Sequence, residues 1–170
     1  MDVDEAIRTR RSVRRYQTTR VPDDLLRQIV EAGIAAPSAG NLQSRRFFVV
    51  KDTRRRGSLA AAAMNQQFIR EAPVAVVVCA DHRIRKEYEQ RGVDLYCLLD
   101  CAAATHSMML AAHARGLATC WVGAFDEAEV ARILDTPRYL RPVSIFPLGY
   151  PAETPTPPSR IRFETACKIM

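Results

Sequence analysis

Basic side chains gather close to the start of the chain. Residues 8–16 read RTRRSVRRY and bring together guanidinium groups, a hydroxyl and main-chain N–H donors, from Arg10, Arg11, Ser12 and Arg14. A guanidinium group offers a planar fork that binds phosphate oxygens two at a time. The segment is therefore a candidate anion site, and a solvated basic stretch or a nucleic-acid patch is the alternative interpretation.

A second candidate segment combines a helix stop with small residues. Residues 35–43 read AAPSAGNLQ, in which Pro37 ends a predicted helix and small side chains let the backbone approach a ligand closely. The amides of Asn41 and Gln43 add hydrogen-bond donors and acceptors. The same residues are also compatible with a plain helix-to-strand connection that contacts no ligand.

The third candidate segment begins at Gly116, after the predicted helix at residues 94–115. Residues 116–126 read GLATCWVGAFD, and a predicted strand delivers Trp121, Val122 and Gly123 to a turn. The main-chain N–H groups of this turn are expected to be open to a ligand. By itself the pattern is weak, because many strands end in a turn that binds nothing.

Common catalytic and metal-binding motifs are absent from the sequence. Neither GxGxxG nor GxxxxGK[ST] occurs, and GxSxG and HExxH are also missing, so a Rossmann turn, a P-loop and a serine hydrolase are not predicted. The odd number of cysteines and their apolar surroundings indicate buried, reduced thiols at Cys79, Cys97, Cys101, Cys120 and Cys167. No metal site is predicted, since no Cys or His cluster completes a set of four ligands.

Composition and charge narrow the classes of protein further. The chain has 170 residues, of which 48% are hydrophobic and 26% charged, as in an ordinary one-domain globular protein. The whole net charge of +6 lies in residues 1–60, where 13 Lys and Arg oppose 7 Asp and Glu. Arg makes up 22 of the 25 basic residues. This favours a phosphate-bearing partner, although an Arg-rich codon bias explains most scattered positions.

No membrane-spanning segment is expected. The longest apolar run, PVAVVVCA at residues 73–80, is far shorter than the roughly 20 residues that a spanning helix needs. The N-terminal residues MDVDEAIRTR include no apolar stretch after their charges, so they do not resemble a secretory signal. A cytoplasmic location is therefore the expectation.

Hydrophobic periodicity predicts the elements that must position the three candidate segments. Compact apolar runs predict four strands, at residues 46–51, 73–80, 117–125 and 143–150. The third of these runs includes the turn that follows its strand. Helices are predicted where apolar residues recur at spacings of three and four, at residues 3–9, between Pro22 and Pro37, and at 54–70, 94–115 and 127–134, the last capped by Asp126. The mixture predicts an α+β fold, with a single domain at residues 1–150.

Two segments suggest a partner subunit. The helix at 94–115 is apolar nearly all round, and such a helix is buried either centrally in its domain or against another chain. The Pro-rich tail of residues 151–170 cannot pack a core of its own. It is expected to be disordered or to lie along the surface of a partner.

Taken together and in this order, these segments resemble the nitroreductase family of FMN-dependent oxidoreductases. The resemblance spans nearly the whole chain and rests on five short motifs, RRSVRRY, PSAGNLQ, EAPVAVVVCAD, LAAHARGLATCWVGAFD and PLGYPAE. It implies a central mixed, mostly antiparallel sheet flanked by helices. It also implies an intertwined homodimer with FMN at the subunit interface.

The resemblance implies roles for individual residues. Contacts with the FMN phosphate and the pyrimidine edge are implied at Arg10, Arg11, Ser12, Arg14 and Arg160. Contacts with the flavin ring are implied at Asn65, Trp121, Val122 and Gly123, with the main-chain N–H groups of the last two near flavin N5. The partner subunit is expected to supply Pro37, Ser38, Ala39 and Asn41.

The implied activity is oxidation of NADH or NADPH and reduction of a nitroaromatic, quinone or similar small-molecule acceptor. Reduction of FMN by two electrons places negative charge on the N1 and C2 carbonyl edge of the ring, where a guanidinium such as that of Arg14 stabilises it. An open flavin face lets the nicotinamide leave before the acceptor enters, which predicts ping-pong kinetics. No catalytic side chain is implied, because the cofactor carries the chemistry.

Other functions stay open on the sequence alone. Relatives within the family carry out reductive dehalogenation or oxidative breakdown of the flavin, and a flavin-binding carrier or sensor without turnover fits the same residues. A nucleic-acid-binding protein is disfavoured, because no RRM, zinc-finger or helix-turn-helix pattern accompanies the basic N-terminal third.

Three features depart from the family pattern. Gln43 is followed by Ser44 and Arg45, where Pro and an aromatic residue are common, which leaves the geometry of this loop open. Pro158 stands where a second basic residue is frequent, so Arg160 acts alone or with Arg162. The chain also lacks the length for the inserted helices that cover the pocket in longer members, which predicts an open flavin face.

Overall fold

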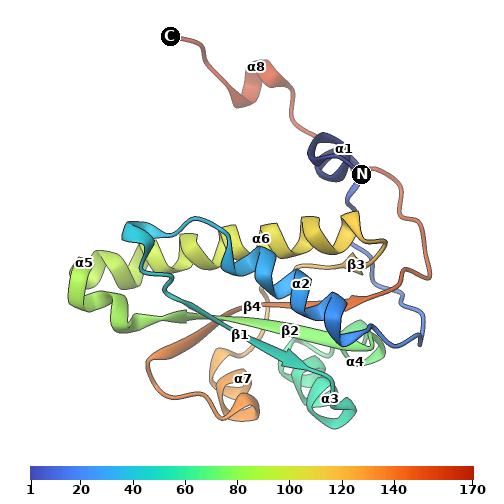
Figure 1. Cartoon of the computed structure of the whole chain (residues 1–170), viewed down its shortest axis with the longest axis horizontal. Coiled ribbons are helices and arrows are strands. Elements are labelled where there is room, and N and C mark those ends of the chain that lie inside the picture. The colour runs from blue at the N-terminus through green and yellow to red at the C-terminus, as the bar shows by residue number, and fades with distance from the viewer.

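The computed structural model describes all of residues 1–170 and contains one four-stranded sheet (Figure 1). The strand order is β1-β2-β4-β3, with β1 at Arg45–Val50, β2 at Val74–Asp81, β3 at Ala118–Thr119 and β4 at Leu140–Gly149. Each strand pairs antiparallel with its neighbours, and an isolated bridge between Ser12 and Thr119 is parallel. The predicted α+β class and mostly antiparallel sheet are confirmed.

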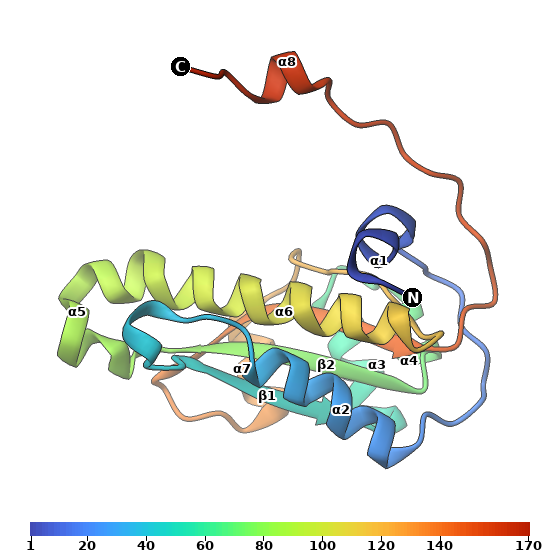
Figure 2. The ribbon, with the colours of Figure 1, turned by 45° about the horizontal axis from the view of Figure 1, so that its top comes forward.

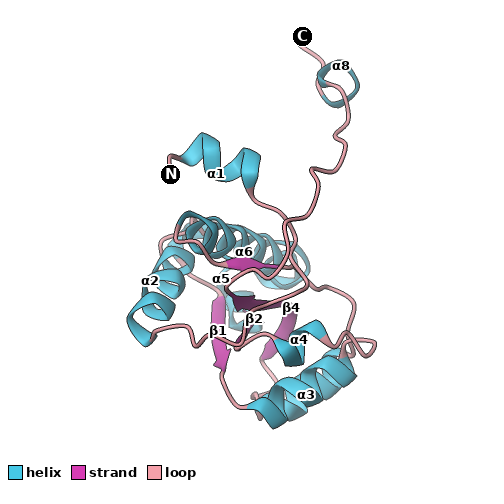
Figure 3. Ribbon diagram, turned by 90° about the vertical axis from the view of Figure 1, so that its right-hand side faces the viewer, coloured by secondary structure: helices cyan, strands magenta, loops and turns pink.

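The central strand β2 is buried along its whole length because helices cover both faces of the sheet. On one face lie α2 (Asp23–Ile34) and α6 (Cys97–Ala114), which pack with Val76 and Val78 in the larger core cluster. On the other face, Val77 and Cys79 belong to a second cluster. Figure 3 shows the sheet edge-on between these two layers. Because both faces of β2 are covered, its residues up to Ala80 are apolar without alternation, which explains the continuous apolar run at residues 73–80.

The face opposite α2 and α6 is covered by three shorter helices (Figure 1). They are α3 (Thr53–Ala62), α4 (Phe68–Glu71) and α7 (Glu127–Leu134). The predicted cap of α7 is confirmed, since Asp126 Oδ1 accepts a hydrogen bond from Glu129 N at 3.0 Å. Asp52 caps α3 in the same way, accepting from Arg55 N at 2.8 Å. Side chains at these starts satisfy N–H groups that have no partner within the helix.

The prediction of one continuous helix over residues 54–70 is wrong in its middle. Helix α3 ends at Ala62, and α4 starts only at Phe68. Between them Met64 and Asn65 have left-handed backbone angles, with φ of 55° and 57°. A helix cannot continue through such angles, and Asn is among the few residues that adopt them readily. The break gives a tight turn that exposes Asn65.

The long helical stretch begins earlier than predicted. A short 3-10 turn at His82–Ile84, α5 at Arg85–Arg91 and a π-helical turn at Gly92–Tyr96 lead directly into α6. Residues 85–91 read RKEYEQR and none of them is buried. Their charge hides the helix from a periodicity argument, because that argument needs an apolar stripe. The stretch is not straight, since Glu89 has a φ of 48°.

By length and composition alone, the helical stretch His82–Ala114 passes the test for a membrane span. Within its most apolar window 44% of the residues are buried in the protein. Its buried side chains, among them Cys97, Cys101 and Met108, pack into the main core against the sheet. A central core helix of a globular domain meets the same criterion.

The N-terminus lies near the C-terminal end of α6, whereas the projecting tail carries the C-terminus far from it (Figure 2). Helix α1 (Val3–Thr9) is joined to α6 by a 2.7 Å hydrogen bond between Thr9 Oγ1 and His113 Nε2. After β4 the chain follows the early basic segment and then leaves the body, with the short helix α8 (Phe163–Ala166) in the projecting tail. Every residue from 156 to 170 is exposed.

Candidate functional site

The structure brings the predicted basic residues from both ends of the chain into one pocket of about 290 Å³. The segment after α1 and the projecting tail each contribute side chains, namely Arg10, Arg11, Ser12, Arg14 and Arg160. Pro155, Thr156 and Pro158 complete the lining. We call this pocket the arginine cradle. Arg162 does not line it, so of the two tail arginines Arg160 is the one that faces the early basic segment.

The electrostatics of Arg10 indicate an anion site. Its Nη1 atom is buried and has no hydrogen-bond partner. Burial, followed by the neighbouring charges of Arg11 and Arg160, lowers the pKa of Arg10 below its usual value. A buried donor without a partner and cations held side by side are both unfavourable until an anion fills the space between them. A phosphate group fits this donor set, because its oxygens accept from several guanidinium groups at once.

The segment that carries these arginines is held between β3 and the chain that follows β4. Val13 N donates to Thr119 O at 3.0 Å, and Gln17 N donates to Tyr150 O at 2.9 Å. Ala152 N in turn donates to the carbonyl of Arg15 at 2.9 Å. The backbone of residues 12–17 is therefore pinned on both sides, although it forms no regular strand of its own.

One carboxylate joins the two parts of the arginine cradle. Glu153 Oε1 accepts hydrogen bonds from the main-chain N–H groups of Arg14 at 2.6 Å and of Arg15 at 3.1 Å. Glu153 is the last residue of the PLGYPAE motif, and no role is expected for it from the sequence. No local signal marks it, because its partners are about 140 positions away in the sequence and only the fold brings them together.

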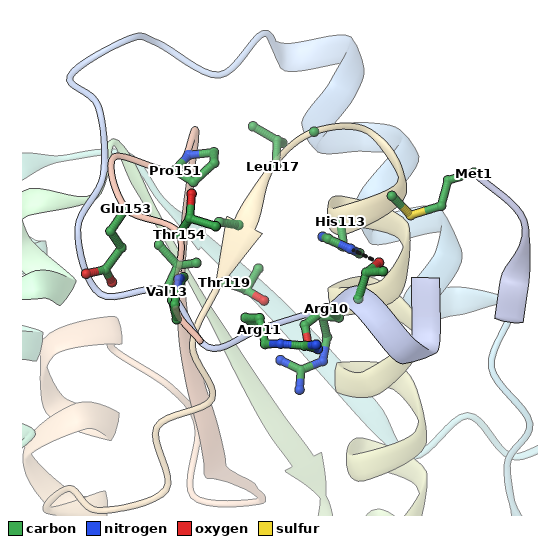
Figure 4. Close-up of a pocket in the computed structure, with 14 residues that line it drawn as sticks. Met1, Arg10, Arg11, Val13, His113, Leu117, Thr119, Pro151, Glu153 and Thr154 are labelled. Atoms are coloured by element: carbon green, nitrogen blue, oxygen red, sulfur yellow. Dashed lines mark hydrogen bonds between the residues drawn. The ribbon is translucent and has the colours of Figure 1, made fainter. Parts of the chain in front are cut away.

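A second pocket of about 270 Å³ lies beside the arginine cradle and shares Arg10, Arg11 and Pro155 with it (Figure 4). His113 and Thr119 line it from α6 and β3, and the figure shows the hydrogen bond of His113 to Thr9. Burial, and then the charges of Arg10 and Arg11, lowers the pKa of His113. The positive potential of the cradle thus extends to this histidine.

Arg14 also contacts the helix that follows the α3–α4 turn. Its guanidinium carbon lies 5.8 Å from the centre of the Phe68 ring, a cation–π arrangement. Asn65 precedes Phe68 by three residues, in the turn with left-handed backbone angles. Arg14 and the turn that carries Asn65 are therefore on the same side of the molecule, next to the cradle.

The predicted turn after β3 differs from expectation in one respect. The N–H group of Val122 is not open, because it donates to Ile145 O at 2.8 Å while Val122 O accepts from Ile145 N at 3.0 Å. Gly123 is exposed, its N–H group has no partner within the chain, and nothing lies within 4 Å of a Cβ placed on it. An open N–H donor is thus correct for Gly123 and wrong for Val122. Trp121 beside them is 40% exposed.

The loop that carries Pro37, Ser38, Ala39 and Asn41 lies away from the arginine cradle. It contacts the N-terminal part of α6, where it borders a pocket of about 270 Å³ with Asp100 and Leu99. Thirteen residues of helix separate Asp100 from His113, which is about 20 Å at 1.5 Å per residue. Within one chain the structure therefore does not bring this loop to the early basic segment.

The departures at Ser44 and Arg45 have a structural explanation. Both side chains are buried, and Ser44 Oγ donates to Asp100 Oδ2 at 2.6 Å. Asp100 Oδ1 accepts from Ala39 N at 2.9 Å, so one carboxylate holds both ends of the loop. Arg45 Nη2 donates to the carbonyls of Ile34 and Ala36 at 2.9 Å and 2.6 Å, at the end of α2. The loop is ordered by these polar contacts.

The cysteines lie apart from this chemistry. All five are free thiols, and four of them are buried as expected. The expectation of a buried thiol is wrong for Cys167, because it lies in the projecting tail and is exposed. Burial raises the pKa of the Cys79 thiol to about 12 and raises the pKa of Cys101 as well. Thiols with raised pKa values are poor nucleophiles at neutral pH.

The α+β fold carries an arginine cradle whose donors suit a phosphorylated ligand. A sequence model described as "Nitroreductase family" matches residues 7–67 and 56–150. The chain is 36% identical over 159 residues to a predicted NADH dehydrogenase/NAD(P)H nitroreductase of Methanothermobacter thermautotrophicus, covering 91% of this chain and 80% of the relative. The chain belongs to the nitroreductase family.

Two further relatives agree with this assignment. The NAD(P)H-linked FMN reductase of Bacillus subtilis is 30% identical over 167 residues, which cover 89% of this chain and 67% of that protein. The solved structure of NfrA2 from B. megaterium superimposes with a TM-score of 0.91 at 26% identity, covering 99% of this chain and 74% of the other. The fold, including the arrangement of helices around the sheet, is therefore that of solved nitroreductase-family structures.

Proposed function

We propose that the protein is an FMN-dependent NAD(P)H oxidoreductase that passes reducing equivalents to a small-molecule acceptor such as a quinone or a nitroaromatic compound. The observation that carries the proposal is the arginine cradle, in which Arg10 keeps a buried donor without a partner. The names of the relatives, an NAD(P)H nitroreductase and an FMN reductase, support the choice of cofactor and donor. The reduced, buried thiols suit a cytoplasmic location.

FMN fits the residues that line the cradle. Arg10, Ser12 and Arg160 would hold the phosphate, with Arg11 adding positive charge beside it. Arg14, kept against Phe68, would reach the pyrimidine edge, and Asn65 on the neighbouring turn would contact the ring. The exposed N–H group of Gly123 would donate to the ring near N5.

When bound, FMN supplies two-electron chemistry at N5, accepting hydride from a nicotinamide and passing electrons to an acceptor. The chain's own groups provide binding and electrostatics. The guanidinium of Arg14 would stabilise negative charge at the pyrimidine edge, which makes transfer to the ring more favourable. The exposed surroundings of Trp121 and Gly123 leave room for donor and acceptor in turn, which favours ping-pong kinetics.

A homodimer is part of the proposal, because one chain cannot bring all the expected contacts to one flavin. The loop at residues 37–41 lies about 20 Å from the cradle end of α6, so a second copy must supply it. Leu99 on α6 is 56% exposed, and Val3 and Ile7 on α1 are also exposed. Exposed apolar side chains on both helices favour burial against a partner.

The tail of residues 151–170 is proposed to pack on the same partner. It projects from the body in Figure 1 and carries exposed apolar side chains, including Ile161, Phe163 and Ile169. An extended arm that buries these residues on the second subunit would gain more from the hydrophobic effect than it loses in chain entropy. Packing of the arm would also hold Arg160 at the cradle.

Spectroscopy of the purified protein tests the proposal. We expect yellow protein or, after addition of FMN, quenching of flavin fluorescence with a one-to-one endpoint per chain. NADH or NADPH should bleach the bound flavin without oxygen, and a quinone or nitroarene should restore its colour. Protein that binds no FMN under any of these conditions contradicts the proposal. FMN binding without bleaching by either nicotinamide instead identifies a carrier or sensor.

A further inference from the structure

We propose that Glu153 is a positioning residue that joins the two separate segments of the arginine cradle. The inference rests on the proposed function, since it concerns the phosphate end of the FMN site. One segment, at residues 10–15, follows α1, and the other, which leads to Arg160, follows β4. Glu153 is the side chain that links them directly.

The hydrogen bonds of Glu153 explain how it acts. One carboxylate oxygen accepts from two successive main-chain N–H groups, those of Arg14 and Arg15, at 2.6 Å and 3.1 Å. A bridge between Tyr16 and Pro151 and the hydrogen bond from Ala152 N to Arg15 O set the register of the two segments. Glu153 extends this pairing by one more residue towards the cradle. The backbone on either side of the phosphate position is thereby fixed.

The charge of Glu153 would by itself oppose its proposed role. A carboxylate near the cradle repels a phosphate, and Glu153 forms no ion pair with any arginine within 4.0 Å. What the structure shows instead is acceptance from main-chain donors. We therefore assign the role of Glu153 to its hydrogen bonds and not to its charge. Arg10 and Arg11, which line the neighbouring pocket together with Glu153, offset its negative charge.

Glu153→Gln and Glu153→Ala should affect the arginine cradle differently. Glu153→Gln keeps an acceptor oxygen at the same place and removes the negative charge. Glu153→Ala removes the charge and both hydrogen bonds, so the N–H groups of Arg14 and Arg15 lose their partner. If hydrogen bonding matters, only the alanine variant harms the cradle. If charge alone matters, both variants bind a phosphate more tightly.

Titration with FMN and with riboflavin, which lacks the phosphate, distinguishes these cases. For Glu153→Ala we expect FMN affinity to fall about tenfold, because the N–H groups of Arg14 and Arg15 lose their charged acceptor, and riboflavin affinity to change much less. Glu153→Gln should bind FMN as tightly as the natural protein or more tightly. Glu31→Ala, an exposed glutamate on α2 without side-chain partners, is the matched control and should change neither affinity.

Hydrogen exchange tests the same inference without flavin. The amides of residues 12–17 should exchange faster in Glu153→Ala than in Glu153→Gln or Glu31→Ala. Equal exchange in all three, equal loss of FMN and riboflavin affinity in Glu153→Ala, or tighter FMN binding by both Glu153 variants would overturn the inference. If the natural protein binds no flavin but the exchange pattern appears, the proposed cofactor is wrong while the positioning role of Glu153 stands.

Discussion

The same side chain takes different roles in this protein according to its surroundings. Arg45 and Arg56 are both buried, and each satisfies main-chain carbonyls, as Arg56 Nη1 does with Lys51 O at 2.6 Å and Pro73 O at 2.9 Å. Arg45 leaves its buried Nε without a partner but still donates to main-chain carbonyls through Nη2. Arg10 differs, since its buried Nη1 has no partner and its side chain lies beside the like charges of Arg11 and Arg160. An arginine that closes hydrogen bonds within the fold stabilises it, whereas an unpaired one prepares a place for a ligand.

The first prediction follows from the unpaired state of Arg10. Arg10→Ala should lower the affinity for FMN about tenfold to a hundredfold, as expected for loss of charge-assisted hydrogen bonds of about 1.5–3 kcal/mol. Without flavin, the same variant should be as stable as the natural protein or more stable, because repulsion from Arg11 and Arg160 is removed. Fluorescence titration and thermal unfolding measure the two effects. Arg54→Ala, at an exposed position of α3, is the control. A lower melting temperature of flavin-free Arg10→Ala would contradict the prediction.

The second prediction concerns how the free energy of unfolding depends on pH through His113. Burial and the charges of Arg10 and Arg11 hold its pKa in the folded protein below the usual 6.5. Between these two pKa values the unfolded chain binds the proton and the folded protein does not, so the free energy of unfolding falls as the pH drops below about 6.5. Urea unfolding at pH 7.5 and pH 5.5 should show a larger loss for the natural protein than for His113→Gln. An equal loss in both proteins argues against the role of His113.

Among the elements, helix α6 sets the distance within one chain between the loop at residues 37–44 and the segment that carries the arginine cradle. Its N-terminal part binds the loop at residues 37–44 through Asp100, and its last turns bind α1 through His113. Loops are ordered by such anchors rather than by their own sequence. The substitution of the common Pro and aromatic residue by Ser44 and Arg45 is compensated by anchors of this kind.

The third prediction tests the anchor on the loop. Ser44→Ala leaves Asp100 Oδ2 buried without its 2.6 Å partner. The free energy of unfolding should fall by about 1–3 kcal/mol, the cost of a buried group that loses its hydrogen bond. Chemical denaturation measures the loss, and Ser58→Ala at an exposed position of α3 serves as the control. A change of less than a few tenths of a kcal/mol would show that the loop is held by other contacts.

At the scale of the whole molecule, residues from the two ends of the chain meet at the C-terminal end of α6. This convergence builds the arginine cradle and leaves the last residues projecting from the body (Figure 2). The projecting arm exposes Phe163 at 61% and Ile169 at 83%. Such exposure is unfavourable for an isolated monomer, and burial on the proposed second copy would relieve it.

The fourth prediction concerns the arm and subunit association. A chain shortened after Arg160 keeps the basic side chain but loses Ile161, Phe163 and Ile169. It should dissociate at protein concentrations where the full chain is dimeric, since much of the apolar contact is lost. Sedimentation velocity over a concentration series measures this. Arg160→Ala should remain dimeric and bind FMN more weakly. An unchanged dimer in the shortened chain would place the interface elsewhere.

Features that depend on neighbours in the chain can be predicted from the amino-acid sequence alone. Helix and strand positions followed from periodicity, the start of α7 from Asp126, and the arginine cradle's N-terminal half from the spacing of Arg10 to Arg14. Patterns of this kind span only one or two helical turns or a few strand residues, so they can be recognised without the tertiary structure. The helix of residues 85–91 escaped because its charges carry no such pattern.

Which polar groups have hydrogen-bond partners and which do not depends on the folded arrangement of distant segments. Ile145 occupies the N–H group of Val122, Asp100 holds Ala39 and Ser44, and Glu153 holds the backbone of Arg14. Each of these bonds joins residues more than 20 positions apart. Hydrogen bonds require approach within about 3 Å in a fixed direction, and between distant residues only the packing of the sheet and helices provides it.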